Sequence, residues 1–449
     1  MQRSIIICFC LLGLTLSGQN KATTPKVRDV IKEFYRQYNI DIFNNLDILP
    51  HVAFEKRKEG WWVITQKISD RQLEPVNKFL FYDNALKRYK PLSLPKVKTP
   101  KQINPANYFD EYTLADYDVN TYYGYKGWYK DVIKDMKDRQ HLSDDELNGL
   151  GRAYSMYAGA LFFDQSGDAL VNEIWQLPFT MNCLSPQQIE QFNLLEAKAQ
   201  ECFKKLANRN PKYETRVGKI GMKYSNEIMF QYMILLAYAD EYAKEMKLPD
   251  NLYTAAQLDT AKRNLENCPG NAILFSFGDN DYYPVHYLQK AKGIRTDVYI
   301  VNYSLLGMDR YIYRATLPVY NASGITLSVD TSLYKGDRNG VIAVKDSSYC
   351  MPFSELLEII RTEQSSEDLK TMFANSISFT KQQGAGVTTV TKIAFNKLRY
   401  LFKNDWVLLD IINNLNGRKI CFPNRFKGSG LQGLDDFLVA RNGLYIYDN

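Results

Sequence analysis

Two short apolar runs near residue 300 constrain the fold of this chain more than any other feature. Residues 271–277 read NAILFSF and residues 298–302 read VYIVN, and each run has the length and composition of a buried strand. Between them lie a polar loop, a helical segment at residues 282–290 and a turn at residues 293–297. Strand, helix and strand of these lengths predict a right-handed βαβ unit with parallel strands. The sequence therefore predicts an α/β fold, with a Rossmann-like parallel-sheet domain over residues 269–449.

The chain before residue 269 divides into two further predicted domains. Residues 19–105 combine a helical segment at 27–38 with strand-like runs at 61–67 and 79–82, which predicts a small α+β lobe. Residues 106–268 have helical periodicity and predict a helical domain. Its candidate helices are 128–137, 144–163, 186–207, 213–247 with a break near Asn226, and 255–267. Residues 197–242 resemble a tetratricopeptide-type array of helical hairpins, and a plain helical bundle is the alternative.

The first 18 residues have the pattern of a secretory signal peptide. Arg3 precedes an apolar stretch at 5–16, and small residues follow it at Ser17 and Gly18. We therefore expect an exported, periplasmic protein. The apolar stretch is shorter than the roughly 20 residues that cross a bilayer, and no later segment is long and apolar enough, so we expect no membrane-spanning segment. Five cysteines at irregular spacing remain after residue 18, which predicts neither a disulfide framework nor a metal site, and no cofactor is expected.

Charge and aromatic content narrow the classes of partner. The chain has 56 Lys plus Arg and 50 Asp plus Glu, and the cations are scattered, so the clustered basic surface of a nucleic-acid-binding protein is absent from the sequence. Aromatic residues make up 13% of the chain, with a Tyr-rich stretch at 108–129. Such rings either stack on sugars or on a partner, or they seal an interface between two lobes.

The loop after the first predicted strand is the strongest candidate site. Gly278-Asp279-Asn280-Asp281 lies where open α/β sheets bind ligands, at the carboxyl end of a strand. Three interpretations remain open. The acidic side chains cap the following helix, they bind a hydroxyl-rich ligand such as a sugar, or they bind a divalent cation. Phosphate is disfavoured here, because two carboxylates would repel it and no phosphate-binding glycine pattern is present.

Further polar residues are expected to join this loop. If the strand ending at Phe422 is parallel to the first two, the cationic loop after it and Asn302 lie at the same edge of the sheet. No catalytic residue is identified. The predicted ligand-binding residues are Gly278, Asp279, Asn280, Asp281, Asn302, Asp309, Arg425 and Lys427.

Residues 270–447 contain a distinctive set of motifs, which are Gly278–Asp281, Pro284, Gly293–Val298, Asn302–Leu306, Asn404–Phe422 and Leu431–Tyr447. By these motifs the segment resembles the soluble C-terminal domain of the bacterial protein O-mannosyltransferase-like family of membrane glycosyltransferases. Tyr282 and Tyr283 depart from the family pattern. The resemblance implies a Rossmann-like domain, but the catalytic portion of that family is embedded in the membrane, so transferase activity is not carried over.

These observations predict a non-enzymatic periplasmic adaptor or binding protein. Its helical repeats would bind an envelope protein, and its α/β domain would bind a glycan or an envelope component. The alternative is a glycan-active enzyme, with Asp279 and Asp281 as paired carboxylates, or an accessory subunit of a glycosyltransferase system.

Overall fold

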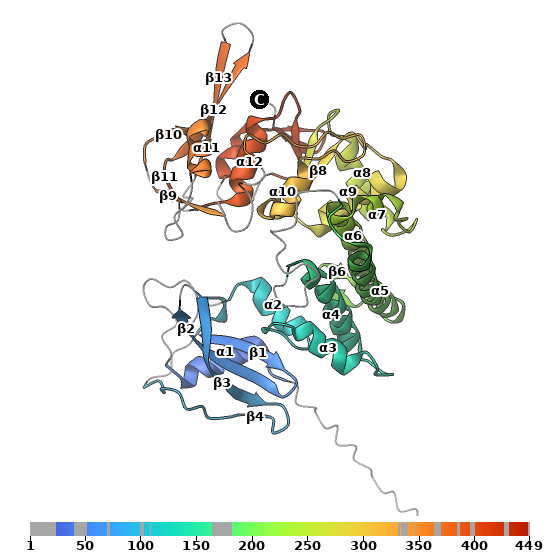
Figure 1. Cartoon of the computed structure of the whole chain (residues 1–449), viewed down its shortest axis with the longest axis vertical. Helices are drawn as coiled ribbons and strands as arrows, with labels where there is room; N and C mark the ends of the chain where they lie inside the picture. Colours follow the sequence, from blue (N-terminus) through green and yellow to red (C-terminus); the bar gives the residue numbers. More distant parts are fainter. Residues whose placement is uncertain are drawn as a thin grey trace, which may run out of the picture. The chain divides into compact units, whose positions relative to one another are not determined.

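The chain divides into two compact units, residues 1–134 and residues 135–449 (Figure 1). Its computed structural model describes residues 24–39, 52–69, 72–98, 103–107, 109–163, 182–330, 333, 340–345, 347–362, 370–383, 387–395, 400–425 and 431–447. The predicted signal peptide and Lys427 lie outside the described residues. The chain is of mixed α/β type and contains parallel strands, as predicted. The predicted domain boundaries near residues 105 and 268 stay predictions.

The first unit consists of a helix packed on an antiparallel sheet. Helix α1 places apolar residues at i, i+3, i+4 and i+7, so they share one face, and Val27, Val30, Ile31 and Phe34 are buried. That face packs against the sheet around Phe54, Trp61 and Phe81. The sheet has the order β1-β2-β3-β4. The elements of this unit are α1 (Val27–Gln37), β1 (Val52–Arg57), β2 (Gly60–Ser69), β3 (Gln72–Asp83), β4 (Arg88–Tyr89), η1 (Pro105–Asn107), α2 (Glu111–Val119) and the first part of α3 (Trp128–Met136).

The Tyr-rich stretch packs within this unit. The ring centroids of Tyr117 and Tyr123 are 4.9 Å apart, and those of Tyr123 and Trp128 are 5.5 Å apart. The Arg57 guanidinium lies 3.6 Å from the ring centroid of Tyr125. These contacts favour internal packing over sugar stacking for the described part of the stretch.

Gly60 is required by the turn between β1 and β2. Its φ of 141° is strained for any other residue, and a Cβ atom would lie 1.8 Å from the carbonyl oxygen of Tyr82. We expect Gly60→Ala to lower the unfolding free energy of the first unit by about 1–3 kcal/mol, measured by urea unfolding. Gly159→Ala is the control, because Gly159 is helical with nothing within 4 Å of its Cβ position, and it should be neutral or slightly stabilising. Equal unfolding midpoints for Gly60→Ala and the unmodified protein would contradict this account.

The second unit begins with packed helices. Helix α5 starts at a capping box in which Ser185 and Gln188 bind each other's backbone N–H groups, with Pro186 at the first helical position. The apolar faces of α4, α5 and α6 bury Phe162, Phe192 and Tyr232 in one core. The elements are α4 (Asp144–Phe163), α5 (Pro186–Arg209), β5 (Glu214–Thr215), β6 (Gly218–Lys219), α6 (Ile220–Tyr238), α7 (Asp240–Glu245) and α8 (Ala255–Glu266).

The predicted helix 213–247 with a break near Asn226 is wrong in two respects. A short β5–β6 hairpin precedes the helix, because Gly218 takes a φ of 109° and turns the chain. The helix then continues through Asn226, whose side chain is bound by other segments, and it breaks at Ala239, where φ is −152° and ψ is 62°.

A five-stranded sheet forms the centre of the remaining chain. Its order is β16-β17-β15-β7-β8, and β15, β7 and β8 are parallel. Phe275 and Val301 face one core and Leu274 and Ile300 face the other, so both faces of the sheet are covered. The strands and their connecting helix are β7 (Ile273–Ser276), α9 (Asp279–Lys292), β8 (Tyr299–Asn302), β15 (Ile420–Phe422), β16 (Leu438–Arg441) and β17 (Leu444–Tyr447). The parallel pairing of the first two predicted strands is confirmed.

Two small sheets and further helices pack beside the five-stranded sheet. Their orders are β10-β12-β13 and β11-β9-β14, and β12 and β13 form a long hairpin (Figure 1). The elements are η3 (Tyr303–Gly307), α10 (Asp309–Ala315), β9 (Val341–Lys345), β10 (Cys350–Pro352), α11 (Phe353–Arg361), β11 (Lys370–Phe373), β12 (Ser376–Gln383), β13 (Val387–Ala394), β14 (Tyr400–Phe402), α12 (Lys403–Asn413) and η5 (Gln432–Phe437).

Residues 325–329 read ITLSV, an apolar and β-branched run that predicts a strand, but no strand forms there. The backbone N–H of Ser328 donates to both carboxylate oxygens of Asp410, at 3.0 and 2.9 Å, so a side chain of α12 takes the place of a neighbouring strand.

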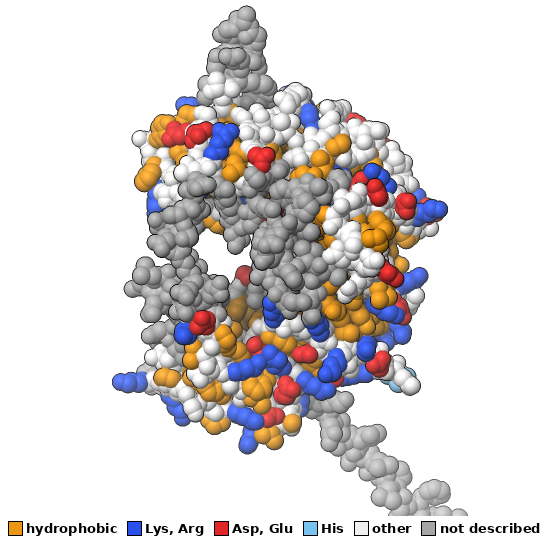
Figure 2. All heavy atoms as spheres, in the orientation of Figure 1, with side chains coloured by type: hydrophobic (Ala, Val, Ile, Leu, Met, Phe, Trp, Pro, Cys, Tyr) orange, Lys and Arg blue, Asp and Glu red, His pale blue; other side chains and the backbone are white. Residues whose placement is uncertain are grey.

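None of the helices in the described part of the chain is long and apolar enough to cross a membrane. On the face drawn in Figure 2, acidic and basic side chains are interspersed with hydrophobic ones.

Candidate functional site

The carboxyl ends of three parallel strands meet at one edge of the five-stranded sheet. Ser276 pairs with Asn302 at the ends of β7 and β8, and β15 runs parallel to β7 and ends at Phe422. The residues that follow each strand therefore lie at the same edge, as expected from the sequence. A row of aromatic rings fixes the three strand ends, because Phe277 lies 6.3 Å from Phe422 and 5.8 Å from Tyr303 between centroids.

Gly278–Asp281 forms the start of α9 at this edge. Gly278 is the N-cap residue and has no side chain that could cap the helix, and Asp279 and Asp281 lie in the first turn, where carboxylates favour the positive end of the helix dipole. Helix α9 begins at Asp279, three residues before the predicted start at Tyr282. Asp279 and Asp281 are exposed, and neither carboxylate has a hydrogen bond or ion pair to another residue in the described part of the chain. We refer to Asp279–Asp281 as the acidic turn.

Asn280 is held in place by neighbouring segments. Its Oδ1 accepts a hydrogen bond from Nδ2 of Asn226 at 2.8 Å, and its Nδ2 donates to the carbonyl oxygen of Val217 at 2.9 Å. The hydroxyl of Tyr253 donates to Oδ1 of Asn226 at 3.1 Å and extends the network. The acidic turn is therefore fixed to α6 and to the β5–β6 hairpin.

The protein environment raises the pKa values of both acids. Burial by surrounding atoms raises the pKa of Asp279, with Lys223 opposing and Glu227 adding to the rise. Burial also raises the pKa of Asp281. Because both side chains still reach solvent, we expect these rises to be smaller than those of a fully enclosed carboxyl. A raised pKa weakens the case for a divalent cation, and no three acidic, His or Cys side chains in the described part gather as metal ligands.

The other predicted ligand-binding residues have structural partners. Oδ1 of Asn302 accepts from the N–H of Ser304 at 3.1 Å and begins η3. Asp309 forms an ion pair with the buried Lys403 at 3.0 Å. The Arg425 guanidinium follows β15 and lies 5.6 Å from the ring centroid of Tyr445. The structure thus brings Asn302 and the acidic turn to one edge, while the ligand roles of Asp309, Arg425 and Lys427 stay predictions.

Sequence reasoning missed a buried acidic cluster close to the acidic turn. Glu196 of α5 is 0% exposed, and neither of its oxygens has a hydrogen bond within the described residues. Glu227 of α6 is also buried and forms an ion pair with Lys223, one helical turn earlier. Burial raises the pKa of Tyr283, and the charges of Asp279, Glu227 and Glu196 raise it further. One sequence signal was available, because Glu227 directly precedes the apolar run of α6 and has Lys223 at i−4.

A family model described as TMEM260-associated domain 2 matches residues 257–383. The match begins in α8 and ends with β12, so it includes the acidic turn, Asn302 and Asp309 but neither Glu196 nor Arg425. No curated protein and no solved structure matches the chain significantly. The resemblance to membrane glycosyltransferases stays a prediction.

Proposed function

We propose that the chain is a non-enzymatic binding protein of the bacterial envelope. Its α/β part, in a Rossmann-like arrangement, binds a hydroxyl-rich ligand of the glycan class at the acidic turn. Its helical part, in a tetratricopeptide-like arrangement, binds an envelope protein. The signal-peptide pattern of residues 1–18 supports a periplasmic location.

The observation that carries this proposal is the pair of exposed, unengaged carboxylates at the carboxyl end of β7. Carboxylates accept strong hydrogen bonds from hydroxyl groups, and Asp279 and Asp281 have no such bond within the described residues. The position is the one at which open α/β sheets bind ligands. The bonds between Asn280, Asn226 and Val217 fix the backbone of the turn, which lowers the entropy lost on binding.

The geometry favours binding over hydrolysis. The raised pKa values of Asp279 and Asp281 are what a general acid needs, and they support the alternative of a glycan-active enzyme. Hydrolysis, however, requires two carboxyl groups that face each other across the sugar, about 5–10 Å apart. Residues i and i+2 of a helix do not face each other, so Asp279 and Asp281 are poorly placed for that role. Release of chromophore from any sugar in a chromogenic panel, lost in Asp279→Asn, would establish the enzyme instead.

We expect Asp279→Asn with Asp281→Asn to weaken glycan binding by about tenfold or more. Hydrogen bonds to a charged acceptor are stronger than those to a neutral amide by roughly 1–1.5 kcal/mol. The measurement is isothermal titration with manno-oligosaccharides and other envelope sugars. Asp259→Asn is the control, because Asp259 is an exposed acid of α8 outside the acidic turn. Absence of heat with every sugar, or equal affinity of the double variant, would refute the glycan site.

The proposed protein partner requires a separate experiment. Leu194 is 61% exposed on α5, which makes it the most exposed of the large hydrophobic residues in the described helices α4 to α8. Cross-linking in intact cells, compared between the unmodified chain and Leu194→Ser, tests whether this helix contacts a partner. A pattern of cross-links without any envelope protein would count against the adaptor role.

A further inference from the structure

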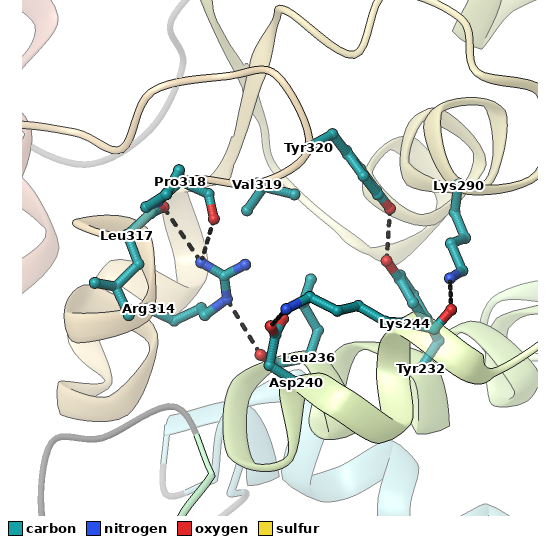
Figure 3. Close-up of a pocket in the computed structure, with 10 residues that line it drawn as sticks. All are labelled: Tyr232, Leu236, Asp240, Lys244, Lys290, Arg314, Leu317, Pro318, Val319 and Tyr320. Carbon is teal, nitrogen blue, oxygen red and sulfur yellow. Dashed lines mark hydrogen bonds and ion pairs between the residues drawn. The ribbon is translucent and has the colours of Figure 1, made fainter.

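A pocket of about 390 Å³ lies in the second unit, away from the acidic turn (Figure 3). Helices α6 and α7, the C-terminal end of α9, α10 and the loop 317–320 form its walls. Its charged side chains are Lys244, Lys290, Arg314 and Asp240. Three cationic residues and one carboxylate among the described lining residues give the pocket a formal charge of +2.

Arg314 is a buried cation without a carboxylate partner in the described part of the chain. Arg314 is only 6% exposed. Nε donates to the carbonyl oxygen of Leu236 at 3.1 Å, and Nη1 donates to those of Leu317 and Pro318 at 3.2 Å each. Nη2 has no hydrogen bond to any described residue, and in Figure 3 it points toward the middle of the pocket. Buried charges are normally paired, so a bound anion would stabilise this guanidinium.

The one carboxylate among the described lining residues, that of Asp240, is already engaged by another cation. Oδ2 of Asp240 pairs with Nζ of Lys244 at 2.5 Å. Nζ of Lys290 donates to the carbonyl oxygen of Lys244 at 2.7 Å, which leaves two of its hydrogens for a ligand. Asp240 therefore leaves the charges of Arg314 and Lys290 uncompensated.

Two tyrosine hydroxyls complete the polar surface of the pocket. The hydroxyl oxygens of Tyr232 and Tyr320 are 2.5 Å apart, and only one of the two hydroxyl hydrogens is used in that bond. Burial raises the pKa of Tyr232 to about 12, so the hydroxyls stay protonated at neutral pH and act as donors. Tyr320 has a φ of 51°, an uncommon backbone conformation for a bulky residue, within a turn closed by hydrogen bonds between Val319 and Ala322.

We propose that this pocket binds a small phosphomonoester, whose phosphate lies between Nη2 of Arg314, Nζ of Lys290 and the tyrosine hydroxyls. A phosphomonoester carries about −1.5 to −2 charges at pH 7, which matches the excess charge of the pocket. Guanidinium and ammonium groups together are characteristic phosphate ligands. Leu236 and Val319 supply an apolar wall for the organic part, and the volume lies within the range of small-molecule sites. This site is independent of the acidic turn.

The test is isothermal titration with glycerol 3-phosphate, inorganic phosphate, succinate and glycerol. We expect glycerol 3-phosphate to bind and glycerol to give no heat. Lys244→Gln with Lys290→Gln should weaken the binding at least tenfold, and Arg314→Lys should weaken it while preserving the near-UV circular dichroism. Lys262→Gln is the control, because Lys262 is an exposed lysine of α8, and it should leave the affinity unchanged.

Three results would overturn the proposal. These are no heat with glycerol 3-phosphate, unchanged affinity in the double lysine variant, and succinate binding as tightly as the phosphoester. The lysine variant keeps the test valid if Arg314→Lys does not fold. Co-sedimentation with phosphatidic acid vesicles, lost in the double lysine variant, would assign the phosphoester to a lipid. Binding of glycerol 3-phosphate without co-sedimentation would assign it to a soluble molecule.

Discussion

Glu196→Gln is expected to stabilise the second unit at pH 8 by about 1–4 kcal/mol and to leave its stability nearly unchanged at pH 5. Glu196 is fully buried, and neither oxygen has a hydrogen bond within the described residues. Burial raises its pKa well above the ordinary value of 4.5, and the charge of Glu227 raises it further, while Lys223 opposes the rise. A glutamine mimics the protonated acid in size and charge. The gain in folding stability therefore appears only at pH values at which the carboxyl of the unfolded chain is ionised.

The sign follows from proton binding. A carboxyl whose pKa is higher in the folded chain binds more protons there, so folding stability falls as the pH rises above 4.5 toward the folded pKa. The substitution removes this slope. Thermal unfolding at pH 5 and pH 8 measures it, and about 2–4 °C of melting temperature is expected per kcal/mol. The exposed Glu190 of α5 supplies the control Glu190→Gln. Equal shifts at the two pH values, or a loss of stability at pH 8, would contradict the prediction.

His286→Leu is expected to protect the second unit against acid. His286 is 3% exposed on α9, and neither ring nitrogen has a hydrogen bond within the described residues. Its ring centroid lies 4.4 Å from that of Tyr282. Burial, together with the nearby charge of Arg314, lowers the pKa of His286 to about 3. The imidazole is therefore neutral in the folded chain, and protonation favours unfolding.

Between pH 6.5 and pH 3 the unfolded chain binds more protons at this residue, so stability falls as the pH decreases. The loss attributable to His286 reaches roughly 3 kcal/mol at pH 4. Urea unfolding at pH 7 and pH 4 should show a smaller loss in His286→Leu by about that amount. His141→Leu, at an exposed histidine, is the matched control and should keep the full loss. If His286→Leu and the unmodified protein lose the same unfolding free energy between pH 7 and pH 4, His286 does not cause the loss.

Local sequence predicted most of the longer helices, the two strands of the βαβ unit and one edge of the candidate site. The helix 144–163 was predicted with the bounds that the structure has, and the βαβ unit followed from the two apolar runs. Parallel strands end at the same edge of a sheet, and this rule predicted that Asn302 and the acidic turn lie at one edge. The predicted strand at 325–329 failed because its backbone is bound by Asp410, which lies 82 residues later than Ser328.

Long-range packing explains what the sequence did not reveal. The sequence does not show that Nε of Arg314 bonds to the carbonyl oxygen of Leu236, 78 residues earlier, or that no carboxylate of the described residues pairs with this guanidinium. Glu196 lies on the apolar face of α5, four residues after Phe192 and three before Ala199, so periodicity predicts that it is buried. Periodicity does not predict that the carboxyl is left without a hydrogen bond among the described residues.

The pairing of β7 with β15 also has a consequence for the order of folding. During synthesis, β7 and β8 leave the ribosome long before Phe422 does, so the inner edge of β7 has no partner while more than a hundred residues are still to be added. An unpaired strand edge of this kind is a template for association with other chains. Nascent or truncated chains that end at residue 383, the last residue of the family match, should therefore need protection by a chaperone that the finished chain does not.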